Sequence, residues 1–319
     1  MNKTTQLFKI CYKDYIVCFL LTAVGISNAS SAQSYEIPNN IQRIVFLGNS
    51  ITYGGRYIEY IDAYLTVKYP EKNYEIINVG LPSETVSGLS EPNHANGRFP
   101  RPDLRDRLER LLTKLKPDLI LACYGINDGI YMPFDDFRFN KFKLGINWLH
   151  DEIEKFGAEI IHITPSVFDE RKGKPYDNVM DIYASWLISN RYTSNWEVID
   201  TYWPMKKSLQ MQRLVDPNFA FSKDGIHPNQ QGHFIIAKHI LLYLNANELD
   251  SSENFENFIS SINNGEEIFR LIEKRQRIQK DSWLSHIGHE RPGMQKGLPL
   301  KEAKEKINAL NKQIQNLLD

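Results

Sequence analysis

The sequence predicts an α/β protein with a doubly wound, three-layer architecture, in which helices cover both faces of a mostly parallel central sheet. From residue 42 onward, short runs rich in β-branched residues alternate with longer runs of helical periodicity, and this alternation is typical of parallel strands joined by helical crossovers. Some of the short runs are almost continuously apolar, as strands covered on both faces are. With 42% hydrophobic residues among 319, the chain can bury a large core.

Five short runs predict the strands of this sheet. The first, which contains IVFL, and the third, LILACY, are apolar nearly throughout, so both are expected to be buried on both faces. The predicted strands are 43–47, 75–79, 119–124, 159–164 and 197–199. In such a sheet the crossovers are right-handed, and ligands bind at the carboxyl ends of the strands.

Helices are predicted between the strands. Pro102 and Pro228 stand where a first helical turn tolerates proline, because the N–H that proline lacks would be unpaired there. The predicted helices are 56–69, 103–115, 138–156, 176–191 and a last one from Pro228 to about Asn245.

Residues 1–32 are predicted to be a secretory signal peptide. Three lysines precede an apolar run over 16–26, and the small residues SNASSA follow it, so cleavage is expected after Ala32. The apolar run is shorter than the about 20 residues that cross a bilayer, and an uncleaved anchor is the alternative. The protein is therefore expected to be periplasmic or secreted, with no membrane span.

Charge and cysteine content bear on the possible partners. The leader carries three lysines and one aspartate, so its removal moves the formal charge from −1 to −3, which does not suggest a nucleic-acid partner. Only Cys123 lies outside the leader, so no internal disulfide is expected. The arginines between 98 and 110 are interspersed with acidic residues, which favours a solvated helix face with ion pairs. The alternative is that Arg98 or Arg101 contacts an acidic substrate.

Ser50 is a candidate nucleophile. It follows the first strand through Gly48 and Asn49, which places its hydroxyl where the sheet ends and a helix begins. A serine hydroxyl is a poor nucleophile unless a neighbouring base accepts its proton. By itself, a serine in this position is more typical of a helix N-cap.

The segment DGIHP at 224–228 offers that base. The spacing of Asp224 and His227 lets one turn present both side chains in the same direction. The carboxylate can then fix one imidazole nitrogen and leave the other free to accept the serine proton.

Two further segments offer donors for an oxyanion, which contribute about 3 kcal/mol each in acyl transfer. Asn127 follows the third strand and can supply a side-chain amide, and the loop that begins at Asn78 can supply a backbone N–H. Asn127 can equally well brace a turn with Asp128 and Gly129.

These segments resemble the sequence blocks of the SGNH or GDSL hydrolase superfamily of esterases and lipases. GNSIT is similar to its first block, with Ser50 as nucleophile, and GIND to its third, with Asn127 as oxyanion donor. DGIHP is similar to its fifth block, with Asp224 and His227 completing a triad. The resemblance spans about residues 42–247 and implies the flavodoxin-like fold of that superfamily.

The sequence departs from the superfamily pattern in two places. Asn49 stands where these proteins usually have aspartate, a swap seen in related carbohydrate esterases. The second block usually reads N-x-x-x-x-G, and the fifth residue after Asn78 is Ser83 rather than glycine. The resemblance implies that the oxyanion is held by the backbone N–H of Ser50 and by the backbone N–H of the residue at position 83. Ser83 can still donate its N–H if its dihedral angles are unstrained, and Gly80 is the fallback donor.

The expected mechanism needs no metal or other cofactor. His227 removes the Ser50 proton during attack on an ester, and water then releases the acid, so activity should fall when His227 is protonated. His227, His233 and His239 are six residues apart and do not share a helix face, and no metal-binding motif is present.

The expected domains are a hydrolase domain over 33–249 and a helical extension over 250–319. An apolar stripe near the C-terminus favours docking of the extension on its own domain over docking on a partner. The stripe consists of Ala303, Ile307, Leu310, Ile314 and Leu317. Residues 281–299 form either a surface connection or a wall of the active-site cleft, with Trp283 facing a sugar ring.

The sequence thus predicts a secreted serine esterase that removes O-acyl groups, most simply acetyl, from a carbohydrate. Tyr131, Arg98 and Trp283 are the candidate substrate-binding residues. One alternative is a lysophospholipase, thioesterase or arylesterase with the same triad, and another is a glycan-binding module that has lost catalysis. The particular glycan and the oligomeric state are not indicated by the sequence.

Overall fold

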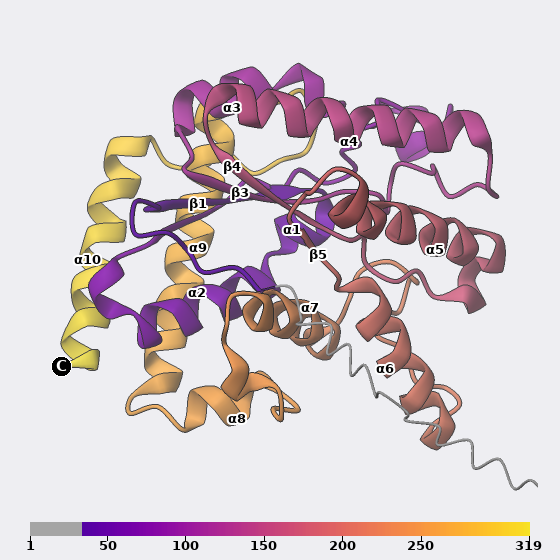
Figure 1. Cartoon of the computed structure of the whole chain (residues 1–319). Helices are drawn as coiled ribbons and strands as arrows, with labels where there is room; N and C mark the ends of the chain where they lie inside the picture. The colour runs from indigo at the N-terminus through magenta and orange to yellow at the C-terminus, as the bar shows by residue number, and fades with distance from the viewer. Residues whose placement is uncertain (1–33) are drawn as a thin grey trace, which may run out of the picture. The chain divides into compact units, whose positions relative to one another are not determined.

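Five parallel strands form the central sheet, in the order β2-β1-β3-β4-β5 (Figure 1). The computed structural model describes residues 34–319, and the signal peptide expected over 1–32 lies outside them. The strands are β1 Arg43–Gly48, β2 Glu75–Asn78, β3 Leu119–Cys123, β4 Glu159–Ile163 and β5 Val198–Ile199. The predicted α/β class and parallel sheet are confirmed, and each strand begins and ends within about a residue of its predicted bounds.

The strand order reverses direction between β1 and β3. β1 pairs with β2 on one side and with β3 on the other, with Gly48 opposite Cys123 at the carboxyl ends. This is the flavodoxin-like order, in which the chain leaves the two central strands toward opposite faces and opens a crevice at their carboxyl ends. The fold therefore places the segments after Gly48 and Cys123 side by side.

Helices cover both faces of the sheet (Figure 1). α3 and α4 lie on one face, α2 and α7 lie on the other, and α9 runs past the edge formed by β2. The α-helices are α1 Ser50–Gly54, α2 Arg56–Lys68, α3 Leu108–Leu115, α4 Asp136–Phe156, α5 Glu170–Thr193, α6 Tyr202–Val215, α7 Gln230–Tyr243, α8 Phe255–Ser260, α9 Gly265–Ile287 and α10 Leu300–Leu318. Short 3₁₀ turns are η1 Pro70–Lys72, η2 His94–Gly97, η3 Leu104–Asp106 and η4 Asn247–Leu249.

Three helices differ from the predicted ones. The helix expected from residue 103 begins only at Leu108, because Asp103 caps the separate turn η3 by accepting the Arg105 N–H. α5 begins about six residues early, with a kink at Gly173. α6 was not predicted, although Tyr202 and Leu209 on its inner face are buried.

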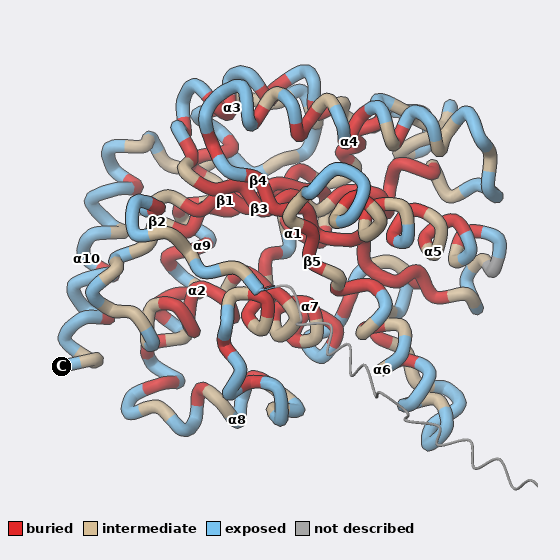
Figure 2. The backbone as a smooth tube through the Cα atoms, viewed as in Figure 1, coloured by how far each residue is buried: buried red, intermediate tan, exposed pale blue. Residues whose placement is uncertain are grey.

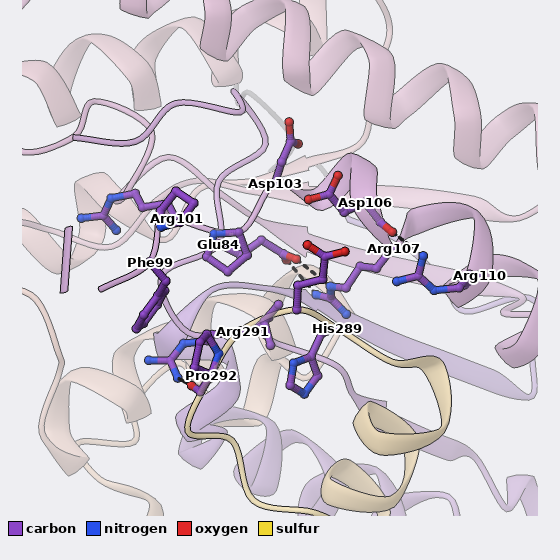
Figure 3. A pocket seen from close by; sticks show the side chains of 14 residues that line it. Glu84, Phe99, Arg101, Asp103, Asp106, Arg107, Arg110, His289, Arg291 and Pro292 are labelled. Carbon is purple, nitrogen blue, oxygen red and sulfur yellow. Dashed lines mark hydrogen bonds and ion pairs between the residues drawn. The ribbon is translucent and has the colours of Figure 1, made fainter. Parts of the chain in front are cut away.

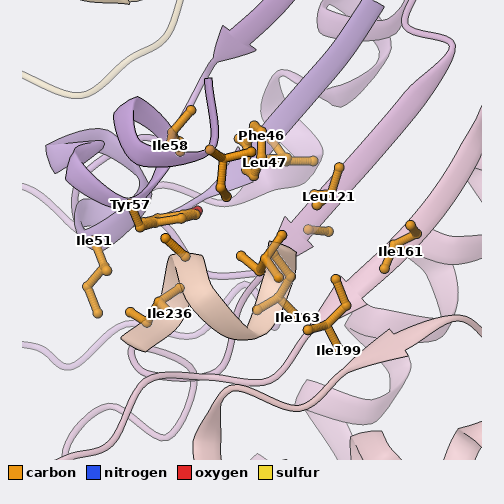
Figure 4. Close-up of a cluster of buried hydrophobic side chains, with 14 of the residues drawn as sticks. Phe46, Leu47, Ile51, Tyr57, Ile58, Leu121, Ile161, Ile163, Ile199 and Ile236 are labelled. Atoms are coloured by element: carbon orange, nitrogen blue, oxygen red, sulfur yellow. The ribbon is translucent and has the colours of Figure 1, made fainter. Parts of the chain in front are cut away.

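The core lies between the sheet and its two helical layers. Figure 2 shows buried residues along the strands and exposed residues on the outer helical faces. In the cluster of Figure 4, side chains of four strands meet side chains of α1, α2 and α7. They include Phe46, Leu47, Ile51, Tyr57, Ile58, Leu121, Ile161, Ile163, Ile199 and Ile236. Each such side chain contributes about 2 kcal/mol by leaving water, so the loops at the strand ends rest on a rigid base.

The C-terminal extension packs on the rest of the described chain. Arg275 of α9 donates to the buried Asp62 carboxylate of α2 at 2.7 Å, and it also binds Asn311 of α10 at 2.6 Å. Gln276 donates to the same carboxylate at 2.6 Å and to the backbone carbonyl of Ile76 in β2 at 2.9 Å. None of the helices in residues 34–319 is long and apolar enough to span a membrane.

Substitution of Arg275 by methionine should lower the free energy of unfolding by about 3 kcal/mol. It leaves the Asp62 carboxylate, which is 1% exposed, without its cation. Urea-induced unfolding measures the change. Arg277→Met is the matched control, since the exposed Arg277 side chain makes no hydrogen bond or ion pair among residues 34–319. Equal unfolding midpoints for the two variants would contradict the prediction.

Candidate active site

Ser50 is the first residue of α1 and comes two residues after β1 ends. The Asn49 side chain accepts the Ile51 N–H at 3.1 Å and so caps α1, which leaves the Ser50 hydroxyl free of a capping role. A Cβ on Gly48 would lie 2.7 Å from the Cys123 carbonyl oxygen. Glycine at 48 thus allows α1 to start directly against the end of β3.

His227 and Asp224 lie beside Ser50 in the order that the sequence predicts. His227 Nε2 is 2.8 Å from Ser50 Oγ, and His227 Nδ1 is 2.6 Å from Asp224 Oδ2. The other carboxylate oxygen of Asp224 accepts the backbone N–H groups of Ile226 and His227, both at 2.9 Å. One tight turn therefore fixes the carboxylate and the imidazole together, three residues apart in the chain.

The charge on Asp224 is stabilised by these contacts. Partial burial acts to raise the pKa of Asp224, but the hydrogen bonds from the His227 ring and from two backbone N–H groups outweigh it and lower the pKa to about 2. The carboxylate stays ionised in neutral solution and can stabilise a protonated imidazole. The His227 side chain is 51% exposed, so the site opens directly to solvent.

A tight turn over Leu81–Glu84 follows β2 and contacts the end of β1, just before the nucleophile. The Leu81 N–H donates to the Gly48 carbonyl at 2.8 Å, and the Glu84 N–H donates to the Leu81 carbonyl at 3.2 Å. Pro82 occupies the second position and Ser83 the third, with a φ of 70°, as in a type II turn. Glycine is favoured at that third position, so Ser83 is held in a strained conformation and the condition of unstrained dihedral angles is not met. Within residues 34–319, its N–H has no hydrogen-bond acceptor.

Gly80 has a packing role. Its N–H already donates to the Asn78 side chain at 2.9 Å, and a Cβ at this position would lie 2.3 Å from the Tyr53 nitrogen. Glycine lets the loop pass against α1. The Gly80 N–H is thus occupied, whereas the Ser83 N–H has no acceptor among residues 34–319, so Ser83 remains the candidate backbone donor.

Asn127 lies after β3 with its amide held at two points. Its Nδ2 donates to the Glu84 carbonyl at 3.1 Å, and its Oδ1 accepts the Tyr131 hydroxyl at 2.9 Å. One amide N–H is left without an acceptor in the described part of the chain. Burial raises the pKa of Tyr131 to about 12, so its hydroxyl remains a donor. Ile130 and Tyr131 both have positive φ, a strained pair of the kind found at functional sites.

Buried acidic and basic residues, which the sequence did not reveal, support the loop after β2 and the loop after β3. Asp128 is fully buried and accepts the N–H groups of Val86, Ser87 and Gly125 at 2.8 to 2.9 Å. These bonds fasten the loop after β2 to the loop after β3. The motif GIND contains Asp128, but nothing in its pattern indicates this partner loop.

Glu84 and Arg107 form a second buried support. Arg107 donates to both Glu84 oxygens at 2.6 and 2.7 Å and to the Val79 carbonyl at 2.9 Å. The Tyr124 hydroxyl donates to Glu84 at 2.6 Å. Burial raises the pKa of Glu84, while Arg107 and Tyr124 favour its charged form. No local sequence signal links residues 84 and 107, which meet only in the fold.

The structure places the three candidate substrate-binding residues in different surroundings. Tyr131 lies at the site, where the guanidinium carbon of Arg101 is 5.0 Å from the centre of the Tyr131 ring. Arg98 is exposed on the loop after η2, where its side chain donates to the Ala95 carbonyl. Trp283 is only 6% exposed and lies near Arg43 and Glu75, at the opposite end of the strands from Ser50. The expectation that Trp283 faces a sugar is therefore wrong: it is a core residue of α9.

The segment after α9 does reach the site, but through other residues. Arg291 donates to the Pro82 carbonyl at 2.8 Å. Figure 3 shows the cavity of about 120 Å³ that residues 289–292 form with the Leu81–Glu84 turn and the loop around Phe99. Among residues 34–319, no group of three or more His, Cys, Asp or Glu side chains is arranged to hold a metal ion.

Comparison with known sequences finds a matching family and a curated relative. The sequence profile of the GDSL-like Lipase/Acylhydrolase family matches residues 46–235, which contain all four predicted blocks. An acetylxylan esterase of Geobacillus stearothermophilus is 24% identical in an alignment 222 residues long, which covers 63% of this chain and 92% of that protein.

Solved structures share the fold. A catalytic mutant of an acetylxylan esterase from Geobacillus stearothermophilus matches with a TM-score of 0.51 and 22% identity, over 64% of this chain and 94% of that one. A gut microbial diltiazem-metabolizing enzyme matches with a TM-score of 0.52 and 22% identity, over 67% of this chain and about half, 49%, of that one. An alpha/beta hydrolase enzyme from the metagenome of Lake Arreo, Spain, matches with a TM-score of 0.51 and 21% identity, over 64% and 95% of the two chains.

Replacing Ser83 by glycine should raise the free energy of unfolding by about 1 kcal/mol, because glycine adopts positive φ without the strain that a Cβ causes. Chemical denaturation measures the gain. Ser83→Ala is the control: it keeps the Cβ and should not stabilise the protein. A stability gain in the alanine variant that matches the gain in the glycine variant would show that φ is not the cause.

Proposed function

The chain belongs to the GDSL-like lipase/acylhydrolase family and is an SGNH-type ester hydrolase, and from this premise we propose that it is a secreted serine esterase that deacetylates a carbohydrate. The observation that carries the proposal is the continuous hydrogen-bonded chain from Ser50 through His227 to Asp224. A serine, an imidazole and an ionised carboxylate in that order form the arrangement that activates a serine for attack on an ester.

In the proposed acylation step, Ser50 Oγ forms a bond to the ester carbonyl carbon while His227 Nε2 takes the hydroxyl proton. The carbonyl oxygen becomes an oxyanion, which the N–H groups of Ser50 and Ser83 and the Asn127 amide stabilise. When the bond to the alcohol breaks, the leaving oxygen takes the proton from His227. The acyl group remains on Ser50.

In the proposed deacylation step, water attacks the acyl carbon and gives its proton to His227. The bond to Ser50 then breaks, the acid leaves, and the proton returns to the serine oxygen. Asp224 stays ionised throughout and stabilises the positive charge on the imidazole.

Two observations support a carbohydrate acetyl ester as substrate. The curated relative is an acetylxylan esterase. In addition, about half of each side chain of Asp224 and His227 is exposed, and such an open site suits a bulky polymer better than a ligand that must be enclosed. A small acyl group is all that has to enter beside Ser50.

Ser50→Ala should abolish ester hydrolysis, with kcat reduced by at least about 10⁴-fold, because the acyl-enzyme can no longer form. Hydrolysis of 4-nitrophenyl acetate gives the rate, and circular dichroism gives the fold. A serine-directed organophosphonate should label the wild type and fail to label the variant. Ser251→Ala, which removes the hydroxyl of an exposed serine outside the site, is the control. Esterase activity retained by Ser50→Ala would refute the assignment.

Activity should decline sharply as the acyl chain of a 4-nitrophenyl ester grows beyond acetyl, and acetate should be released from acetylated polysaccharides. Mass spectrometry across a panel of such polysaccharides measures the release. Wild type that cleaves butyrate and octanoate esters faster than acetate, with no acetate released from the panel, would instead support the lipid-directed or small-ester alternative.

A further inference from the structure

We propose that Arg101 and Arg291 are positioning residues that clamp the Leu81–Glu84 turn and keep the Ser83 N–H directed at the oxyanion. This inference rests on the proposed function, in which that N–H is a donor. Each arginine binds a carbonyl group of the turn, one from the loop after η2 and the other from the C-terminal extension.

The turn needs to be held from outside. Ser83 has a φ of 70°, a conformation that non-glycine residues disfavour, and it stands where the related proteins usually have glycine. Internally, the turn is closed by one hydrogen bond of 3.2 Å from the Glu84 N–H to the Leu81 carbonyl. The peptide groups on either side of Ser83 can therefore rotate unless other contacts fix their carbonyl oxygens.

Arg101 contacts both sides of the proposed oxyanion site. Its side chain is 4% exposed, and Glu91 holds it through two hydrogen bonds of 2.7 and 2.8 Å. Its Nη1 donates to the Ser83 carbonyl at 3.4 Å, and its guanidinium lies 5.0 Å from the centre of the Tyr131 ring. Tyr131 in turn donates to Asn127 Oδ1. One immobilised cation thus links the backbone donor and the side-chain donor.

Arg291 holds the preceding peptide. Its Nε donates to the Pro82 carbonyl at 2.8 Å, and its guanidinium lies 5.4 Å from the centre of the Phe99 ring. Phe99 is two residues before Arg101, so the two arginines are joined through one loop. Figure 3 shows Arg101, Phe99 and Arg291 along one side of the cavity. The C-terminal extension therefore contributes to the site through Arg291.

The test compares Arg291→Met and Arg101→Met with Arg270→Met, a control on α9 whose side chain is 66% exposed and pairs with the exposed Glu267. Both clamp variants should lose about tenfold or more in kcat for 4-nitrophenyl acetate, because a donor displaced by a fraction of an ångström stabilises the transition state poorly. KM should stay within about twofold, since the donor acts on the transition state. Arg270→Met should match the wild type.

The deciding measurement repeats Arg291→Met in a Ser83→Gly background. Glycine adopts positive φ without external support, so the turn should keep its shape and the loss in kcat should shrink to about threefold or less. A merely structural role for Arg291 elsewhere in the protein would give the same loss in both backgrounds. Arg291→Lys, which keeps a donor and a charge, covers the case in which the methionine variant does not fold.

Two results would contradict the proposal that Arg101 and Arg291 hold the Leu81–Glu84 turn. One is an unchanged kcat in both arginine variants, and the other is an equal loss from Arg291→Met with and without the Ser83→Gly substitution. Neither affects the esterase assignment, which depends on the wild type and on Ser50→Ala. A wild type inactive on every ester would instead remove the proposed function while leaving the turn geometry as it is.

Discussion

The Asp128 carboxylate holds together the two loops that carry the candidate oxyanion donors. It accepts the N–H groups of Val86 and Ser87 from the loop after β2 and of Gly125 from the loop after β3. The residue is fully buried, so these donors must replace the water that the carboxylate gives up. Both loops grow from strands that flank β1 in a rigid parallel sheet, and Asp128 sets their separation together with the hydrogen bonds from Tyr124 and Asn127 to Glu84. The geometry around Ser50 thus depends on a group that takes no part in the proposed chemistry.

The C-terminal extension is built into the same region. Lys280 of α9 lies 3.9 Å from the centre of the Tyr53 ring in the nucleophile helix α1 and donates to the Tyr53 carbonyl at 3.1 Å. Arg291 binds the Pro82 carbonyl in the adjoining turn. The extension therefore contacts the segment that carries the nucleophile and the segment that carries the backbone donor. These contacts come from outside residues 46–235, the part of the chain that the family profile matches.

Sequence reasoning succeeded where the signal is local. Apolar β-branched runs located the strands, and motifs of a few residues singled out Ser50 and His227, whose side chains the fold brings into contact. It failed where the information lies in the tertiary structure. Trp283 was misplaced because a large aromatic on a helix has the same pattern in a core as in a binding cleft. Glu84 and Asp128 were missed because their partners are remote in the chain, and α6 was missed because its short apolar stripe follows a weak strand.

The side chain of Gln276 has a consequence for how molecules of this protein behave toward one another. It donates to the Ile76 carbonyl of β2, the outermost strand on that side of the sheet. An outermost strand normally offers a row of unsatisfied backbone groups onto which a strand from a neighbouring molecule can add. Here α9 shields that row and engages one of its acceptors. The same helix that steadies the fold thus also guards against self-association into extended β-structure.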